Sequence, residues 1–230
     1  MNDILSSSTF FGLFLTLTAY ALALEIKKRF RSSLVSPLLL AVIMCIAVLA
    51  VFRIDYDTYH QSARYISFLL TPATVCLAIP LYQQLEKLKK NFPAIMIGIL
   101  SGVLSSLGSI YLLAKVFHFS REEYITFLPK SITTAIGMSV SEEFGGYVAI
   151  TVTVIILTGI FGNIICEKVL KIFGIRNRIA KGIAIGTASH AIGTAKAMEI
   201  GEIEGAMSSL SVVVSGILTV ILAGLFVGLY

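Results

Sequence analysis

The stretch "GTASHAIGTAKAMEIGEIEGA" at residues 186–206 decides the fold, because it is a polar, glycine-broken segment between long apolar runs. It carries a His, a Lys, several Glu and several hydroxyl groups, whereas most of the chain is Leu, Ile, Val and Ala. An interrupted helix at membrane depth is stable only where protein or a water-filled cavity satisfies its backbone groups. The segment therefore predicts a protein-lined site inside a membrane.

The composition is that of an integral membrane protein. The mean hydropathy is +0.90, with 57% apolar and only 13% charged residues, whereas a soluble domain has roughly 25% charged residues. A helix needs ~20 apolar residues to cross the hydrocarbon core of a bilayer. Runs suited to this lie at residues 4–24, 34–52, 65–81, 92–116, 147–166 and 207–229. We therefore expect an all-α polytopic protein in the lipid bilayer with six transmembrane helices.

The basic residues predict the orientation of these helices. They cluster at 27–31, 87–90 and 168–181, whereas the alternate loops are near neutral or acidic. The positive-inside rule places the three basic loops in the cytoplasm and both termini outside. Because this location explains the formal charge of +5, we expect no nucleic-acid partner.

Neither a metal site nor an enzyme is indicated. Cysteines at 45, 76 and 166 and histidines at 60, 118 and 190 have no metal-ligand spacing, so we expect no metal and no cofactor. Ser189 and His190 are the two residue types of a serine nucleophile and its base, but neighbours on a helix do not face each other. We expect no catalytic residues.

The predicted topology leaves two polar segments whose position relative to the membrane must be explained. Residue 118 lies outside and residue 167 inside, and the run at 147–166 already supplies one crossing, so 125–146 must dip into the membrane and return. By the same count 182–206 starts and ends inside. A charged residue at mid-bilayer costs roughly 2.5–3.5 kcal/mol, so neither segment faces lipid. We expect two re-entrant or broken-helix hairpins entering from opposite faces.

The two segments also resemble each other. A shift of sixty residues aligns 130–146 with 190–206 and matches six of seventeen positions, among them Thr134 with Thr194 and Glu142 with Glu202. Inverted repeats with broken helices near the midplane are typical of secondary transporters. We predict a scaffold at 1–64 and a transport core at 65–230, with repeats at about 125–170 and 185–230.

The tips of these hairpins are the candidate site. Ser and Thr cap helix N-termini, whose positive dipole end suits an anion, and lysines add formal charge. The candidate substrate-binding residues are Lys130, Ser131, Thr133, Thr134, Ser189, His190, Gly193, Thr194 and Lys196. The candidates for ion coupling or charge balance are His190, Glu142 and Glu202.

Each candidate also has a purely structural interpretation. Lys196, Glu199, Glu202 and Glu204 fit the solvated end of a helix at the cytoplasmic surface. His190 fits a buried histidine with satisfied hydrogen bonds, and Ser and Thr in membrane helices commonly bond their own backbone or join helices. The sequence leaves both interpretations open.

Three strings of the sequence are similar to the LrgB/CidB family of antiholin-like membrane proteins. They are "LPKSITTAI" at 128–136, "KGIAIGTASHAIGTAKAMEIGEIEGAMSSL" at 181–210 and "PATVCLAIPLY" at 72–82. The resemblance covers nearly the whole chain. Family members often have Pro where Ala135 stands and Gly where Thr71 stands, and we expect the first departure to soften the turn of the outer hairpin.

The resemblance implies two classes of function. One is alternating-access transport of a small monocarboxylate, such as pyruvate or glycolate, across the bacterial cytoplasmic membrane, because a relative is the plastid glycolate/glycerate transporter. The alternative is regulation of murein hydrolase activity and cell lysis with a small LrgA/CidA-type membrane partner. Paired broken helices with Lys and Glu favour transport. We also expect that the first two helices form the interface of any homodimer.

Overall fold

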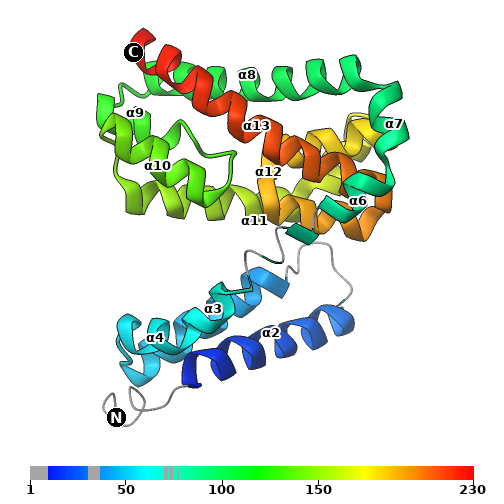
Figure 1. Cartoon of the computed structure of the whole chain (residues 1–230). Helices are drawn as coiled ribbons and strands as arrows, with labels where there is room; N and C mark the ends of the chain where they lie inside the picture. The colour runs from blue at the N-terminus through cyan, green and yellow to red at the C-terminus, as the bar shows by residue number, and fades with distance from the viewer. Residues whose placement is uncertain (1–9, 31–36, 70–71, 73–74, 77) are drawn as a thin grey trace. The chain divides into compact units, whose positions relative to one another are not determined.

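The computed structural model describes residues 10–30, 37–69, 72, 75–76 and 78–230, and within these ranges the regular structure is helical, without a strand (Figure 1). The chain divides into two compact units, Met1–Cys76 and Leu77–Tyr230. The sequence places the boundary after residue 64. The roles of scaffold and transport core stay predictions.

The first unit consists of α2 (Phe11–Phe30), α3 (Pro37–Phe52) and α4 (Tyr56–Ser67). Helices α2 and α3 pack through small side chains, Ala19 and Ala23 against Ala41 and Cys45, which let two helices approach closely. The start of α2 is tied to α4, because the backbone N–H of Gly12 donates to Ser62 Oγ at 2.6 Å.

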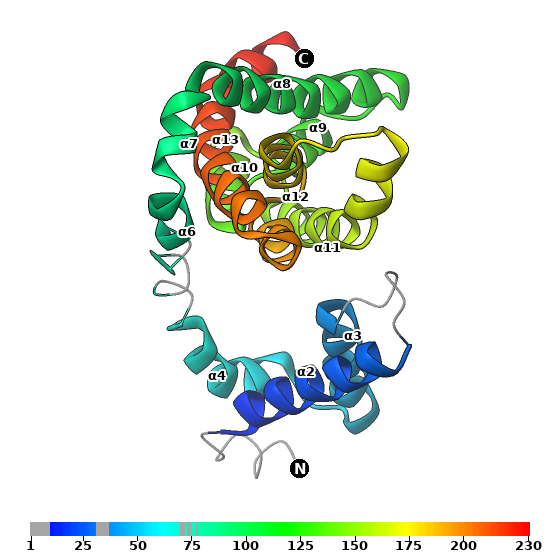
Figure 2. The ribbon, with the colours of Figure 1, turned by 90° about the vertical axis from the view of Figure 1, so that its right-hand side faces the viewer.

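The second unit holds the remaining helices. They are α6 (Ala78–Gln83), α7 (Leu85–Lys90), α8 (Phe92–Val116), α9 (Arg121–Phe127), α10 (Thr134–Phe144), α11 (Val148–Ile172), α12 (Arg178–Ile200) and α13 (Glu202–Leu229). Helix α12 contacts α8, α11 and α13, and Figure 2 shows it surrounded by these three. The largest core of the unit joins α8, α9 and α13, with Ile99, Leu107 and Met207 fully buried.

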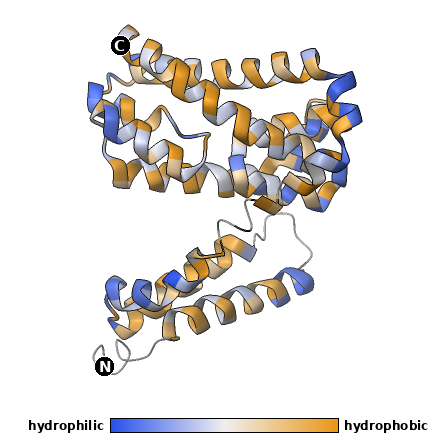
Figure 3. Ribbon diagram, in the orientation of Figure 1, coloured by the Kyte–Doolittle hydropathy of each residue, from blue (hydrophilic) through white to orange (hydrophobic). Residues whose placement is uncertain are grey.

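Among the described residues, three helices are long and apolar enough to cross a membrane, namely α8, α11 and α13, and α3 is a shorter apolar helix. Figure 3 shows hydrophobic residues along their length. The predicted run at 92–116 coincides with α8. Within the predicted run at 65–81, α4 ends at Ser67 and α6 begins at Ala78. Residues 70–71, 73–74 and 77 of this run lie outside the described residues. The same holds for 4–9 and 34–36 of the first two runs. The count of six stays a prediction.

Helix α12 folds back on itself at His190, whose φ of 42° and ψ of −140° are not helical. A straight helix of this length would separate its ends by about 34 Å. Instead, Arg178 at its start bonds Glu204 just beyond its end, and a Cβ on Gly193 would lie 3.2 Å from the carbonyl oxygen of Ile185. The predicted break in this segment therefore lies at His190, within the quoted stretch.

Helices α9 and α10 form the other bent segment, joined by a turn at 128–133. Helix α9 begins with a capping box between Ser120 and Glu123, and Gly145, whose φ of 87° favours glycine, is the C-cap of α10. The backbone N–H of Tyr147 donates to Thr126 Oγ1 at 2.8 Å. The chain thus returns to α9 before α11 begins.

Two packing contacts are related by the shift of sixty residues, under which positions 126 and 151 correspond to 186 and 211. Thr151 Oγ1 donates to the carbonyl of Thr126 at 3.0 Å, and a Cβ on Gly186 would lie 2.8 Å from the Cβ of Ser211. Each contact joins the helix before a bend to the long helix that follows it. The two segments therefore share a pattern of packing as well as of sequence, while their inverted placement in a membrane stays a prediction.

Candidate functional site

A cavity of about 710 Å³ lies in the second unit between α8, the turn after α9 and the first half of α12. Its polar lining residues are Asn91, Ser101, Ser105, Ser106, Ser109, Lys130, Ser131, Asn177 and Thr187. The rest of the lining is Gly, Ala and Ile. Lys130 carries the single formal charge among these lining residues, so the cavity has a net positive charge.

The Lys130 ammonium group is held by two hydroxyl groups. Its Nζ donates to Ser131 Oγ at 2.9 Å and to Ser106 Oγ at 3.3 Å, and Ser106 Oγ donates to Ser131 Oγ at 3.1 Å. No carboxylate in the described part of the chain lies within ion-pairing distance of Lys130. Since an ammonium group has three donors, one donor and the full charge remain for an anion in the cavity.

One side of α8 forms the wall opposite α12, and the sequence-based list of candidates missed it. Ser101, Ser105 and Ser109 recur every four residues among apolar neighbours. A Cβ on Gly102 would lie 2.9 Å from Thr187 Oγ1, so this glycine lets α12 approach. The helical recurrence of Ser and Gly in an apolar run is the signal that identifies such a wall.

The predicted residues of the outer segment divide into two groups. Lys130 and Ser131 line the cavity. Thr133 is the N-cap of α10 and Thr134 its first residue, and neither lines the cavity. The structure thus brings two of these four residues together at the cavity, with Ser106 as an additional partner.

The predicted residues of the inner segment lie at the bend of α12, where Thr187 and Ala188 reach the cavity instead. Ser189, His190, Gly193 and Thr194 are buried. His190 Nε2 lies 2.9 Å from the carbonyl of Ile155, and because a carbonyl only accepts, Nε2 carries the proton. A Cβ on Gly159 of α11 would lie 2.7 Å from this imidazole. The bend of α12 therefore packs directly against α11.

Thr194 joins the second half of α12 to α13. Its Oγ1 donates to the carbonyl of His190 at 3.0 Å and lies 2.8 Å from Ser208 Oγ. Both contacts are buried. Thr194 therefore stabilises the bend beside the cavity, and a ligand-binding role for it stays a prediction.

The predicted charged residues beyond the bend lie outside the cavity lining. Lys196 forms ion pairs with Glu167 of α11 at 2.6 Å and with Glu199 at 3.1 Å, and its side chain is 18% exposed. Glu142 on α10 and Glu202 at the start of α13 are exposed. Their roles in binding or ion coupling stay predictions, and no group of three or more potential metal ligands lies among the described residues.

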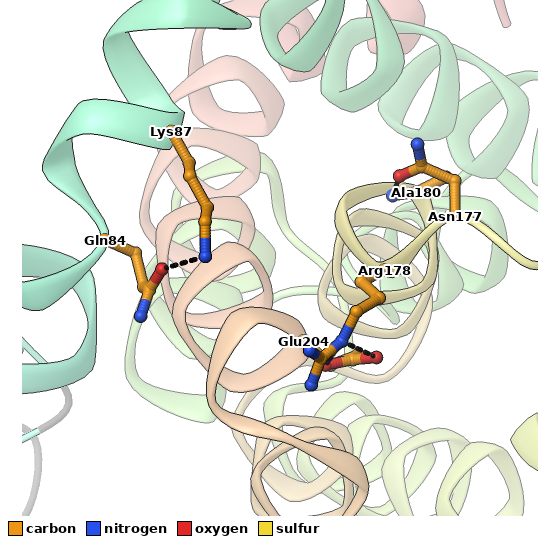
Figure 4. Close-up of polar contacts among 6 residues, drawn as sticks. All are labelled: Gln84, Lys87, Asn177, Arg178, Ala180 and Glu204. Atoms are coloured by element: carbon orange, nitrogen blue, oxygen red, sulfur yellow. Dashed lines mark hydrogen bonds and ion pairs between the residues drawn. The ribbon is translucent and has the colours of Figure 1, made fainter.

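A further ion pair, which the sequence did not indicate, joins the start of the bent helix α12 to the residues just beyond its end (Figure 4). Arg178 Nε donates to both carboxylate oxygens of Glu204, at 3.1 and 3.2 Å. The Glu204 side chain is 3% exposed, whereas that of Arg178 is 56% exposed. Since a buried carboxylate requires a partner, this pair joins the start of α12 to α13.

The apolar helices, the bent segments and the lysine-containing cavity define an α-helical membrane protein. The chain belongs to the LrgB-like family, whose model matches residues 16–229. It is 37% identical over 216 residues to holin-like protein CidB of Staphylococcus epidermidis, covering 94% of each chain. It is 38% identical over 223 residues to antiholin-like protein LrgB of Bacillus subtilis, covering 96% of each, and 35% identical over the full length of both chains to holin-like protein CidB of Staphylococcus aureus. No solved structure matches the chain.

Proposed function

We propose that this protein binds a small monocarboxylate, such as pyruvate or glycolate, in the cavity at Lys130 and carries it across the cytoplasmic membrane. The observation that carries the proposal is the Lys130 ammonium group, which lines a cavity and has hydroxyl partners but no carboxylate partner among the described residues. Hydrogen bonds to a charged group are stronger than neutral ones. A carboxylate would complete this arrangement.

The mechanism is alternating access. The cavity includes Asn91 and Asn177, the N-caps of α8 and α12, which adjoin the basic segments expected in the cytoplasm. We therefore assign the structure to the inward-facing state. The bend at His190, the turn at Lys130 and the related packing contacts support two inverted repeats, which in secondary transporters meet around the substrate.

Uptake of labelled pyruvate, lactate and glycolate into proteoliposomes tests the proposal. Lys130→Gln removes the charge, and we expect at least about tenfold lower uptake, the effect of losing a hydrogen bond to a charged group. Lys89→Gln is the matched control, since Lys89 is exposed on α7, and it should transport like the wild type. Absence of uptake by the wild type under every gradient would contradict transport.

The second candidate is a role in controlling cell lysis, and the names of the relatives favour it more directly than they favour transport. Those relatives are named holin-like and antiholin-like. In this case the protein acts with a small LrgA/CidA-type membrane partner. Co-purification of such a partner, and a lysis phenotype that Lys130→Gln leaves unchanged, would favour this role over transport. A phenotype lost together with uptake would instead link lysis to substrate flux.

A further inference from the structure

A second cavity, of about 350 Å³, lies where α11 ends and α12 begins. It is separate from the Lys130 cavity, with which it shares no lining residue. Three cationic side chains line it: Lys171 from α11, Arg176 from the connecting loop and Lys181 from α12. A concave site lined by three cations is suited to an anion with several oxygens, such as phosphate.

The charge of this pocket is not neutralised by its own acidic residue. Glu167 is the single acidic lining residue, and it is already paired with Lys196 at 2.6 Å. Within the described ranges, no carboxylate lies at ion-pairing distance from Lys171, Arg176 or Lys181. The three cations are therefore left to an external anion.

The backbone around the pocket is fixed by local hydrogen bonds. Gly174, two residues beyond the end of α11, has a φ of 63°, and the N–H of Ile175 donates to the carbonyl of Leu170 at 2.9 Å. This bond is typical of a Schellman motif. Asn177 then caps α12, because its side chain accepts from the N–H of Ala180 at 3.1 Å. The pocket is thus formed before any ligand binds.

Apolar groups connect the pocket with the expected lipid phase. Its floor consists of Leu170, Ile175 and Ile200, which pack in one core cluster. On the adjoining turn, Ile172 and Phe173 are 78% and 75% exposed. Exposed apolar residues beside a basic pocket at the end of a membrane-spanning helix match the surroundings of a phospholipid headgroup.

We propose that this pocket binds the phosphate group of an anionic phospholipid of the cytoplasmic leaflet. Lys171, Arg176 and Lys181 contact the phosphate oxygens, while Ile172 and Phe173 lie against the lipid chains. The inference is independent of the proposed transport, because the pocket and the Lys130 cavity have different lining residues. It assigns the α11–α12 loop a lipid-binding role.

Native mass spectrometry of the full-length protein tests the proposal, with phosphatidylglycerol and phosphatidylcholine as probes. We expect retention of phosphatidylglycerol, weakened about tenfold or more in the triple variant Lys171→Gln, Arg176→Gln, Lys181→Gln. The triple variant Lys87→Gln, Lys89→Gln, Lys90→Gln removes the same charge from the expected same membrane side, and should bind the lipid like the wild type. Equal weakening in both variants, or in neither, would overturn the proposal.

A gain-of-function variant guards against loss of binding through misfolding. Glu167→Gln removes the single acidic lining group and releases Lys196, so phosphatidylglycerol should bind about threefold or more tightly. Unchanged or weaker binding would contradict the proposed electrostatics. Inorganic phosphate is the third probe: if it raises the melting temperature of lipid-free protein while no phospholipid is retained, the lipid assignment is wrong and the pocket serves a soluble phosphate.

Discussion

Single residues hold the bent helix α12 in place, and Glu204 is one of them. Its carboxylate is almost completely buried and is bound by the Nε of Arg178. Removing the arginine leaves a buried carboxylate without its partner, which costs more than removing both groups. The pair therefore behaves as a unit.

We predict that Arg178→Gln lowers the free energy of unfolding by about 1–3 kcal/mol. The double variant Arg178→Gln, Glu204→Gln should recover part of this loss, because the buried charge is gone. Thermal unfolding of purified protein in detergent measures both effects as changes in melting temperature. Strictly additive losses in the double-mutant cycle would show that the pair is not coupled.

The backbone at His190 supports a second prediction about a single residue. Its φ of 42° with ψ of −140° is a conformation that glycine tolerates far better than other residues. His190→Gly and His190→Ala both lose the hydrogen bond to Ile155, but only the alanine variant keeps the strained backbone. The free energy of unfolding of the glycine variant should exceed that of the alanine variant by about 1–3 kcal/mol. The difference is measured as a higher melting temperature. A more stable alanine variant would contradict strain at the bend.

At the scale of the elements, the contact between α12 and α13 depends on the absence of side chains. A Cβ on Gly186 would lie 2.5 Å from the backbone oxygen of Ser208 and one on Gly182 2.5 Å from that of Glu204. Both obstacles are backbone atoms, which cannot rotate away. Close approach through small residues is the usual way in which membrane helices associate.

We predict that Gly186→Ala destabilises the protein by about 1–3 kcal/mol, because the added methyl group forces the helices apart. Gly108→Ala is the matched control: it makes the same change inside α8, where a Cβ meets nothing within 4 Å. The control should be neutral or slightly stabilising, since alanine favours a helix. Equal melting temperatures for the two variants would contradict the tight contact.

The sequence predicts these elements unevenly. The bounds of α8 follow from its apolar run, which coincides with residues 92–116. The break at His190 lies in the polar stretch that decides the fold, because glycine and hydroxyl residues interrupt an apolar pattern there. The ion pairs of Lys196 with Glu167 and of Glu204 with Arg178 were not predictable, since the partners lie 29 and 26 residues apart and meet only through tertiary packing. The serine wall of α8 was overlooked within a hydrophobic run.

At the scale of the whole molecule, the distribution of basic residues predicts one orientation in the membrane. We expect a membrane-impermeant maleimide to label Asp57→Cys and His118→Cys in intact cells, each in a background lacking Cys45, Cys76 and Cys166. Lys89→Cys and Lys171→Cys should be labelled only after permeabilisation. The reverse pattern would invert the orientation, and labelling of all four in intact cells would contradict the topology.

The glycine surface of α11 restricts how this protein can change shape. Gly159 leaves room for the imidazole of His190, and Gly162 for the hydroxyl of Ser189. Because these side chains fill the space that the glycines leave, we expect α11 and the bend of α12 to move together in any conformational change. On the opposite side of α12, Thr187 packs against Gly102 of α8 in the same way, beside the hydroxyl-lined cavity. We expect that any motion of α12 relative to α8 must first separate Thr187 from Gly102.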